Sequence, residues 1–119
     1  FIRQIHETSF SIESEHFDWY AMTAQMENFC QHYNLSRSRT DNMLHVIDES
    51  LAILGAAPAM RITLAYSEQD DTLQLTVTAP QGISPEVFES EENGIAMTIL
   101  RNFSRDISTN GNTLRVTIK

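Results

Sequence analysis

Residues Arg61–Thr78, RITLAYSEQDDTLQLTVT, contain two segments in which apolar and polar side chains alternate. Such alternation is typical of β-strands with one buried face, so the pattern predicts strands at Arg61–Tyr66 and Thr72–Thr78. The polar residues 67–71 between them predict a hairpin loop. These two strands are expected to form the centre of a largely antiparallel sheet.

Upstream of this hairpin, the first amphipathic helix is predicted from about Glu15 to Tyr33, with Ser14 as its N-cap. A short strand, Phe10–Ile12, precedes it. The apolar residues assigned to the buried side of this helix recur at three- and four-residue steps: Phe17, Tyr20, Met22, Ala24, Met26, Phe29 and Tyr33. The same stretch contains Cys30, which we interpret as a buried thiol.

A second amphipathic helix follows, with Leu44, Ile47, Leu51 and Leu54 at steps of three and four residues. Thr40 or Asp41 is expected to cap its N-terminus. Its predicted end is Gly55 with Pro58 just beyond, a pattern typical of a helix stop.

After the hairpin the chain carries a loop with Gly82, an acidic run from Glu86 to Glu92, and a helix predicted to start near Gly94. The face expected to be buried consists of Ile95, Ile99, Leu100 and Phe103. A last alternating strand is predicted at Thr113–Ile118, after the turn signal Asn110-Gly111-Asn112.

This order of elements predicts an α+β fold, a two-layer α/β sandwich with helices on one face of a mostly antiparallel mixed sheet. The other face of the sheet is expected to be wet. Its predicted residues are Thr63, Gln74, Thr76, Arg115 and Thr117. With 119 residues the chain is expected to form a single domain, 1–119.

The charge and composition exclude several classes of function. A net charge of −8 repels phosphate backbones, so nucleic-acid binding is not expected. No stretch approaches the roughly 18 apolar residues of a membrane span, and direct membrane insertion is not expected either. One cysteine and no signal-peptide pattern in Phe1–Glu7 favour a cytoplasmic location. The absence of an initiator Met suggests a piece of a longer protein.

Three further stretches carry a resemblance to a known family. Asn42–Ala52, NMLHVIDESLA, looks like the first nucleotide-binding helix of the GHKL ATPases, and Asn93–Leu100, NGIAMTIL, looks like their last glycine motif. Ser104–Ile107 and Gly111–Ile118 resemble their closing strand pair. The chain is therefore similar to the GHKL, or histidine-kinase-like, ATPase superfamily, and nearest within it to the small anti-sigma-factor serine kinases.

The resemblance implies site residues, several of which are replaced. Glu49 stands where the family has its catalytic carboxylate, but four residues later, where an Asn holds Mg²⁺, this chain has Ile53. If Asp48 is aligned instead, that position is Ala52. Neither replacement can bind the metal.

At the adenine motif, Thr78 replaces the family's Asp and only Gly82 of the two glycines is kept. At the phosphate motif Gly94 is kept and the second glycine has become Ala96. We expect no metal site, and ATP with Mg²⁺ only if other groups replace the missing ones.

Two hypotheses follow from this mixture. The first is a degenerate, noncatalytic pseudo-ATPase that acts as a regulatory or protein-binding module, with weak or no ATP binding. The alternative is an ATP-dependent protein serine kinase with Glu49 as base. The expected partner is another protein or the remainder of a larger one, and the family likeness also implies a homodimer paired through a sheet edge.

Each candidate residue also has a structural interpretation. Glu49 and Asp48 can form the solvated side of a helix, and His45 can pair with Glu49 one turn away. Gly94 can start a helix that approaches the sheet closely. The acidic run 86–92 occupies the place of the family's ATP lid, and we expect a mobile or solvated loop there.

Overall fold

The computed structural model describes residues 4–119. Phe1–Arg3 lie outside the described residues, and with them the start of the Phe1–Glu7 segment in which no signal-peptide pattern was found. The elements in chain order are β1 (Ile5–Ser11), α1 (Trp19–His32), α2 (Arg37–Leu54), β2 (Arg61–Ser67), β3 (Thr72–Thr78), two 3₁₀ turns η1 (Pro85–Phe88) and η2 (Glu91–Asn93), α3 (Gly94–Asn102), β4 (Ser104–Asn110) and β5 (Thr113–Ile118).

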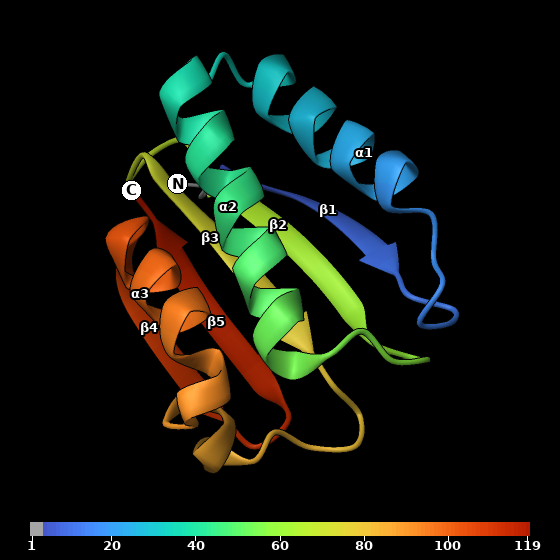
Figure 1. Ribbon diagram of the computed structural model, residues 1–119. Coiled ribbons are helices and arrows are strands. Elements are labelled where there is room, and N and C mark those ends of the chain that lie inside the picture. The colour runs from blue at the N-terminus through green and yellow to red at the C-terminus, as the bar shows by residue number, and fades with distance from the viewer. Residues whose placement is uncertain (1–3) are drawn as a thin grey trace.

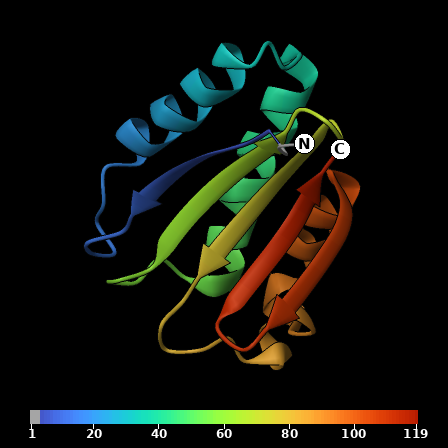
Figure 2. The same cartoon turned by 180° about the vertical axis from the view of Figure 1, so that it is seen from behind.

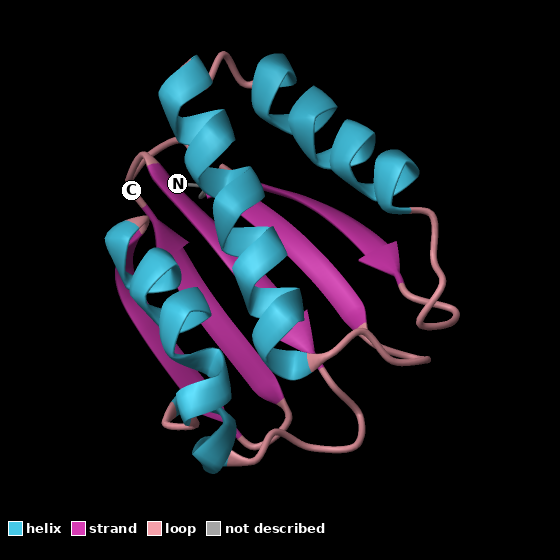
Figure 3. Ribbon diagram, in the orientation of Figure 1, coloured by secondary structure: helices cyan, strands magenta, loops and turns pink. Residues whose placement is uncertain are grey.

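The five strands form one sheet in the order β1-β2-β3-β5-β4, with the helices on one face (Figures 1 and 3). This confirms the predicted α+β two-layer sandwich. All four strand pairs are antiparallel, so the sheet is not mixed. The register of β4 on β5 shifts between Ser104 and Asp106, which places a β-bulge at that edge.

The back of the sheet carries no helix (Figure 2). The polar side chains predicted for this face, including Thr63, Gln74 and Arg115, alternate with buried ones in their strands. The Ser9 and Thr63 hydroxyls lie 2.9 Å apart across β1 and β2. The expectation of one wet face is therefore confirmed.

The core lies between the sheet and the helices. Its fully buried helix residues include Met22, Met26, Cys30, Met43, Val46 and Leu100, and its fully buried strand residues include Ile62, Leu64, Leu73, Leu75, Leu114 and Val116. Burial raises the pKa of the Cys30 thiol, in agreement with its interpretation as a buried residue. No helix in residues 4–119 is long and apolar enough to cross a membrane.

Side chains near the start of α2 attach this helix to the sheet, and Asp71 is also held by a residue of β2. The Arg39 guanidinium donates to Asp71 Oδ1 at 2.6 Å, and the Tyr66 hydroxyl donates to the same atom at 2.8 Å. The amide of Asn42 donates to the carbonyl of Lys119 at 3.1 Å. Arg39 and Tyr66 hold the pKa of Asp71 below its usual value. The start of α2 is therefore fixed to the β2–β3 hairpin and to the end of β5.

The predicted starts of the first two helices were wrong. α1 begins at Trp19, where Asp18 Oδ1 accepts the Ala21 amide at 2.9 Å, rather than after Ser14. α2 begins at Arg37, capped by Ser36, four residues before the expected region of Asp41. The predicted end of α2 at Gly55 is confirmed, because Gly55 has a φ of 76° and its amide bonds to the Leu51 carbonyl.

Some predicted core residues are exposed. Tyr20 is 84% exposed and Ile95 is 79% exposed, although each belongs to the apolar pattern of its helix. β1 is longer than the predicted strand at 10–12, and β4 was expected only from the family resemblance. β4 shows no alternation, because nearly all its residues are exposed.

Candidate functional site

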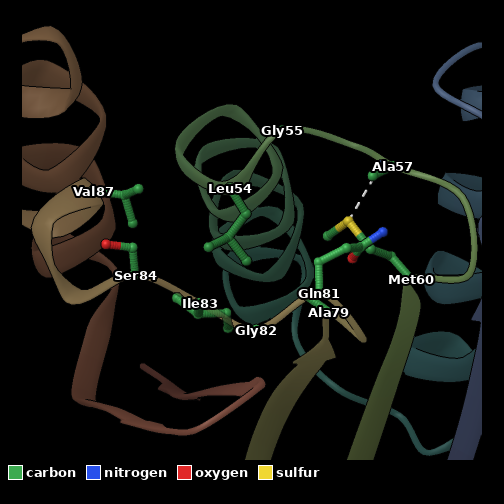
Figure 4. A pocket seen from close by; sticks show the side chains of 10 residues that line it. All are labelled: Leu54, Gly55, Ala57, Met60, Ala79, Gln81, Gly82, Ile83, Ser84 and Val87. Carbon is green, nitrogen blue, oxygen red and sulfur yellow. Dashed lines mark hydrogen bonds between the residues drawn. The ribbon is translucent and has the colours of Figure 1, made fainter.

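A cavity of about 250 Å³ lies at the C-terminal end of α2, beside the loops that enter β2 and leave β3 (Figure 4). Its lining comes from the end of α2 and the next turn (Leu54, Gly55, Ala57 and Met60) and from the segment after β3 (Ala79, Gln81, Gly82, Ile83, Ser84 and Val87). The resemblance to GHKL ATPases places the adenine motif in this second segment.

Backbone hydrogen bonds hold the cavity walls in place. The Ala79 amide donates to the Asn112 carbonyl and the Ile83 amide donates to the Gly111 carbonyl, at 2.8 and 3.1 Å, so the loop after β3 is tied to the β4–β5 turn. Gly82 sits between them at a φ of 88°, a conformation that glycine adopts without strain. On the other wall, the Ala57 amide donates to Met60 Sδ at 3.2 Å (Figure 4).

The cavity offers little polar chemistry. None of its ten lining residues is ionisable, and Gln81 and Ser84 are the only ones with polar side chains. The Gln81 amide already donates to the Pro58 carbonyl at 3.4 Å. An uncharged apolar group fits such a lining better than a phosphate does.

A second hollow, of about 400 Å³, adjoins the first and shares Leu54, Gly55, Ser84 and Val87 with it. Ala52 and Ile53 line it, and these are the two alternative positions at which the resemblance to GHKL ATPases implies a Mg²⁺ ligand. The other wall carries the carboxylates Glu86 and Glu92. No group of three or more His, Cys, Asp or Glu side chains within residues 4–119 is placed to hold a metal ion.

The acidic segment around this hollow is folded onto the protein. It forms the two 3₁₀ turns, and Val87 and Phe88 pack against the core. The Asn93 amide donates to the Val87 carbonyl at 2.8 Å, which closes the segment onto the start of α3. The expected solvated loop is therefore a short folded connection with its carboxylates outside.

Glu49 lies on α2, one turn after His45, whose ring stacks on Phe103 at the end of α3 with 4.6 Å between ring centroids. Glu49 is half-buried, and its Oε2 atom is buried without a hydrogen-bond partner. Desolvation and the neighbouring Asp48 charge raise the pKa of Glu49 above its ordinary value, and the charge of His45 opposes them. The carboxylate is thus perturbed but has no partner positioned for chemistry at that atom.

The structure does not bring the sequence-predicted site residues together. Gly82 lines the cavity, whereas Thr78 ends β3 on the polar side of the strand pattern, next to buried Val77 and Ala79. Ala79 therefore occupies the inward position in place of Thr78. Glu49, Gly94 and Ala96 line neither hollow.

Gly94 is the first residue of α3, as predicted, but it is exposed with a φ of −57°. A Cβ added there would have no atom outside its immediate neighbours within 4 Å. The close approach to the sheet that was considered for this glycine is therefore absent. Ala96 is half-buried and packs against the core.

No protein-family model matches the chain, and a search of the curated proteins found no match.

Sequence reasoning missed most of the cavity. Leu54 was assigned to the core, and Ala57 and Met60 were given no role, because a wall made by two distant loops leaves no periodic signal. Tyr20 was assigned to the core for a different reason. Tyr20 fits the apolar period of α1, and only its exposure distinguishes it from a core residue.

Proposed function

We propose that this domain is a noncatalytic module of the GHKL-like type, which works by binding a protein partner rather than by turning over ATP. The observation that supports this proposal is the chemistry of the two hollows at the end of α2. One is lined by uncharged residues, and the other places Ala52 and Ile53 opposite Glu86 and Glu92.

The magnitudes favour weak nucleotide binding. Loss of the carboxylate that pairs with adenine removes about 1.5–3 kcal/mol, or roughly ten- to a hundredfold in affinity. The Glu86 and Glu92 carboxylates beside the second hollow add repulsion toward a triphosphate. The position of Thr78 outside the cavity lining removes its hydroxyl as a substitute acceptor.

Isothermal titration with ATP and Mg²⁺ tests the proposal. We expect no saturable heat at micromolar nucleotide, and a micromolar dissociation constant would overturn the noncatalytic assignment. The double variant Glu86→Lys/Glu92→Lys is the matched probe, with the exposed Glu15→Lys as its control. If nucleotide enters the second hollow, the double variant binds it more tightly and Glu15→Lys does not.

The alternative, an ATP-dependent protein serine kinase of the anti-sigma type, is favoured by one observation. Glu49 has a raised pKa and an unpaired Oε2 atom, which are properties of a general base. That reading requires Glu49→Ala to abolish phosphate transfer in an assay with labelled ATP. Absence of transfer by the unaltered domain removes the alternative.

A further inference from the structure

A groove of about 520 Å³ is lined by residues of α1 and α2, among them the exposed Tyr20 and Asp48. The two helices meet at the loop that joins them and diverge toward Trp19 (Figure 1). Trp19, Thr23 and Glu27 follow one another at four-residue steps along one wall. Leu44 and Asp48 form the same kind of row on the other wall.

The lining combines apolar and acidic groups with one histidine, His45, whose ring stacks on Phe103. Trp19 and Leu44 are half-buried, and Tyr20 lies beside them at the rim. Glu27 and Asp48 add two carboxylates, and the lining contains no Lys or Arg. Arg37 reaches Glu27 from outside the groove at 3.8 Å but lies closer to Asp41, at 2.9 Å.

The packing of the domain does not use Tyr20. It is 84% exposed, whereas Met22 and Met26 on the same helix are completely buried. Tyrosine and tryptophan are enriched at protein interfaces, because they bury a large area and lose little side-chain entropy. Trp19 packs partly on the core, so the exposed Tyr20 beside it is the residue that indicates a surface for a partner.

The charge of the molecule selects the partner's chemistry. A net charge of −8 repels nucleic acids and anionic membranes and attracts a basic segment. A groove between two helices suits a third helix, which would place apolar side chains against Trp19 and Leu44 and basic ones toward Glu27 and Asp48. We propose that the α1–α2 groove binds a basic amphipathic helix of a protein partner. This inference rests on the proposed function as a binding module.

Trp19 makes the groove directly observable, because it is the only tryptophan in the chain. The probe is a synthetic amphipathic peptide of about 15 residues, roughly four helical turns, with Leu on one face and Lys on the other. Titration near physiological salt should change the Trp19 emission and saturate. A peptide with Glu in place of Lys should leave the emission unchanged, as should one with the same composition in scrambled order.

Two variants place the peptide in the groove. Tyr20→Ala and Asp48→Lys should each weaken binding roughly three- to tenfold. Their matched controls lie at and just before the start of α3, outside the groove lining, namely Ile95→Ala, another exposed apolar residue, and Glu91→Lys. The controls should change affinity by less than about twofold. Circular dichroism of all four variants checks that each one still folds.

The outcomes separate this inference from the proposed function. No response to the basic peptide, or equal losses in the variants and their controls, overturns the groove assignment. A Trp19 response to anionic vesicles without one to the peptide overturns it in favour of a lipid surface. The noncatalytic assignment is decided independently by the ATP titration, because the groove shares no lining residue with the two hollows.

Discussion

Glu49 shows how one residue can be placed correctly on a helix and still be misjudged. Its spacing from His45 predicts a surface pair, yet the His45 ring stacks on Phe103 and Glu49 Oε2 is left buried without a partner. Helical spacing brings two side chains to one side of a helix but cannot show what the next helix places there. The aromatic partner of His45 is Phe103, the C-cap residue of α3, fifty-eight positions further along the chain. Local sequence patterns do not connect positions that far apart.

We predict that Glu49→Gln stabilises the domain at neutral pH by about 0.5–1 kcal/mol, because it removes a poorly solvated charge. The pKa of Glu49 is raised in the folded state. Its contribution to stability therefore falls as the pH rises above the unfolded value of about 4.3. Below that pH the Glu49 carboxyl is neutral in both the folded and the unfolded chain, and the stability gained by Glu49→Gln should disappear.

Urea unfolding of the two proteins at pH 7 and near pH 4 measures this difference. The exposed Glu15→Gln serves as the control, with no expected change. A loss of stability in Glu49→Gln at pH 7 would mean that the carboxylate makes a favourable contact in the folded protein.

At the scale of elements, all three helices were predicted, but only the start of α3 was placed correctly. Ser14, Asp18, Ser36 and Asp41 can all cap a helix, so composition alone cannot choose between them. Packing determines which residue caps α1. Phe17 packs on the core from the segment before α1, so the helix begins only at Trp19. β4 could not be predicted from periodicity, since it is an edge strand whose residues are nearly all exposed and show no alternation.

Asp18→Ala should destabilise the domain by about 1 kcal/mol, because Asp18 Oδ1 accepts the Ala21 amide at the start of α1. Ser14→Ala is the matched control. Its hydroxyl accepts the His16 amide outside any helix, and we expect a change below about 0.5 kcal/mol. Thermal unfolding followed by circular dichroism compares the two variants. A larger effect at Ser14 would restore the earlier helix start.

For the whole molecule, the two-layer arrangement followed from the sequence, whereas the site did not. Alternation in β2, β3 and β5 and the period of α2 define which faces meet, and these faces form the core. The cavity at the end of α2 depends on loops whose paths are set by bonds such as Ile83 to Gly111. Such bonds join positions that no pattern relates, so the placement of Thr78 outside the cavity was not foreseen.

The excess of acidic groups predicts that salt stabilises this domain. Sixteen Asp and Glu residues face eight Lys and Arg residues, so self-repulsion in the folded state exceeds attraction. Raising NaCl from about 10 to 150 mM shortens the Debye length from roughly 30 to 8 Å. The melting temperature should rise by about 4 °C for each 1 kcal/mol of repulsion removed.

Differential scanning calorimetry across this salt range provides the measurement. A falling melting temperature would contradict the prediction and would mean that attractive pairs such as Arg39–Asp71 outweigh the repulsion. Arg39→Gln is a useful comparison. It removes the attractive pair and should leave the salt response steeper than in the unaltered protein.

The β-bulge near the start of β4 makes the two borders of the sheet unequal. A bulge interrupts the regular spacing of hydrogen-bonding groups, and the exposed Arg105 and Asp106 beside it add charge, so this border is a poor template for another strand. β1 pairs with β2 without such an interruption, and the Gln25 side chain of α1 donates to the Ser9 carbonyl on this strand. If two copies were joined through their β1 strands, the regular border of each sheet would be paired and the bulged β4 borders would lie at the two ends. These bulged ends would then disfavour the addition of further strands.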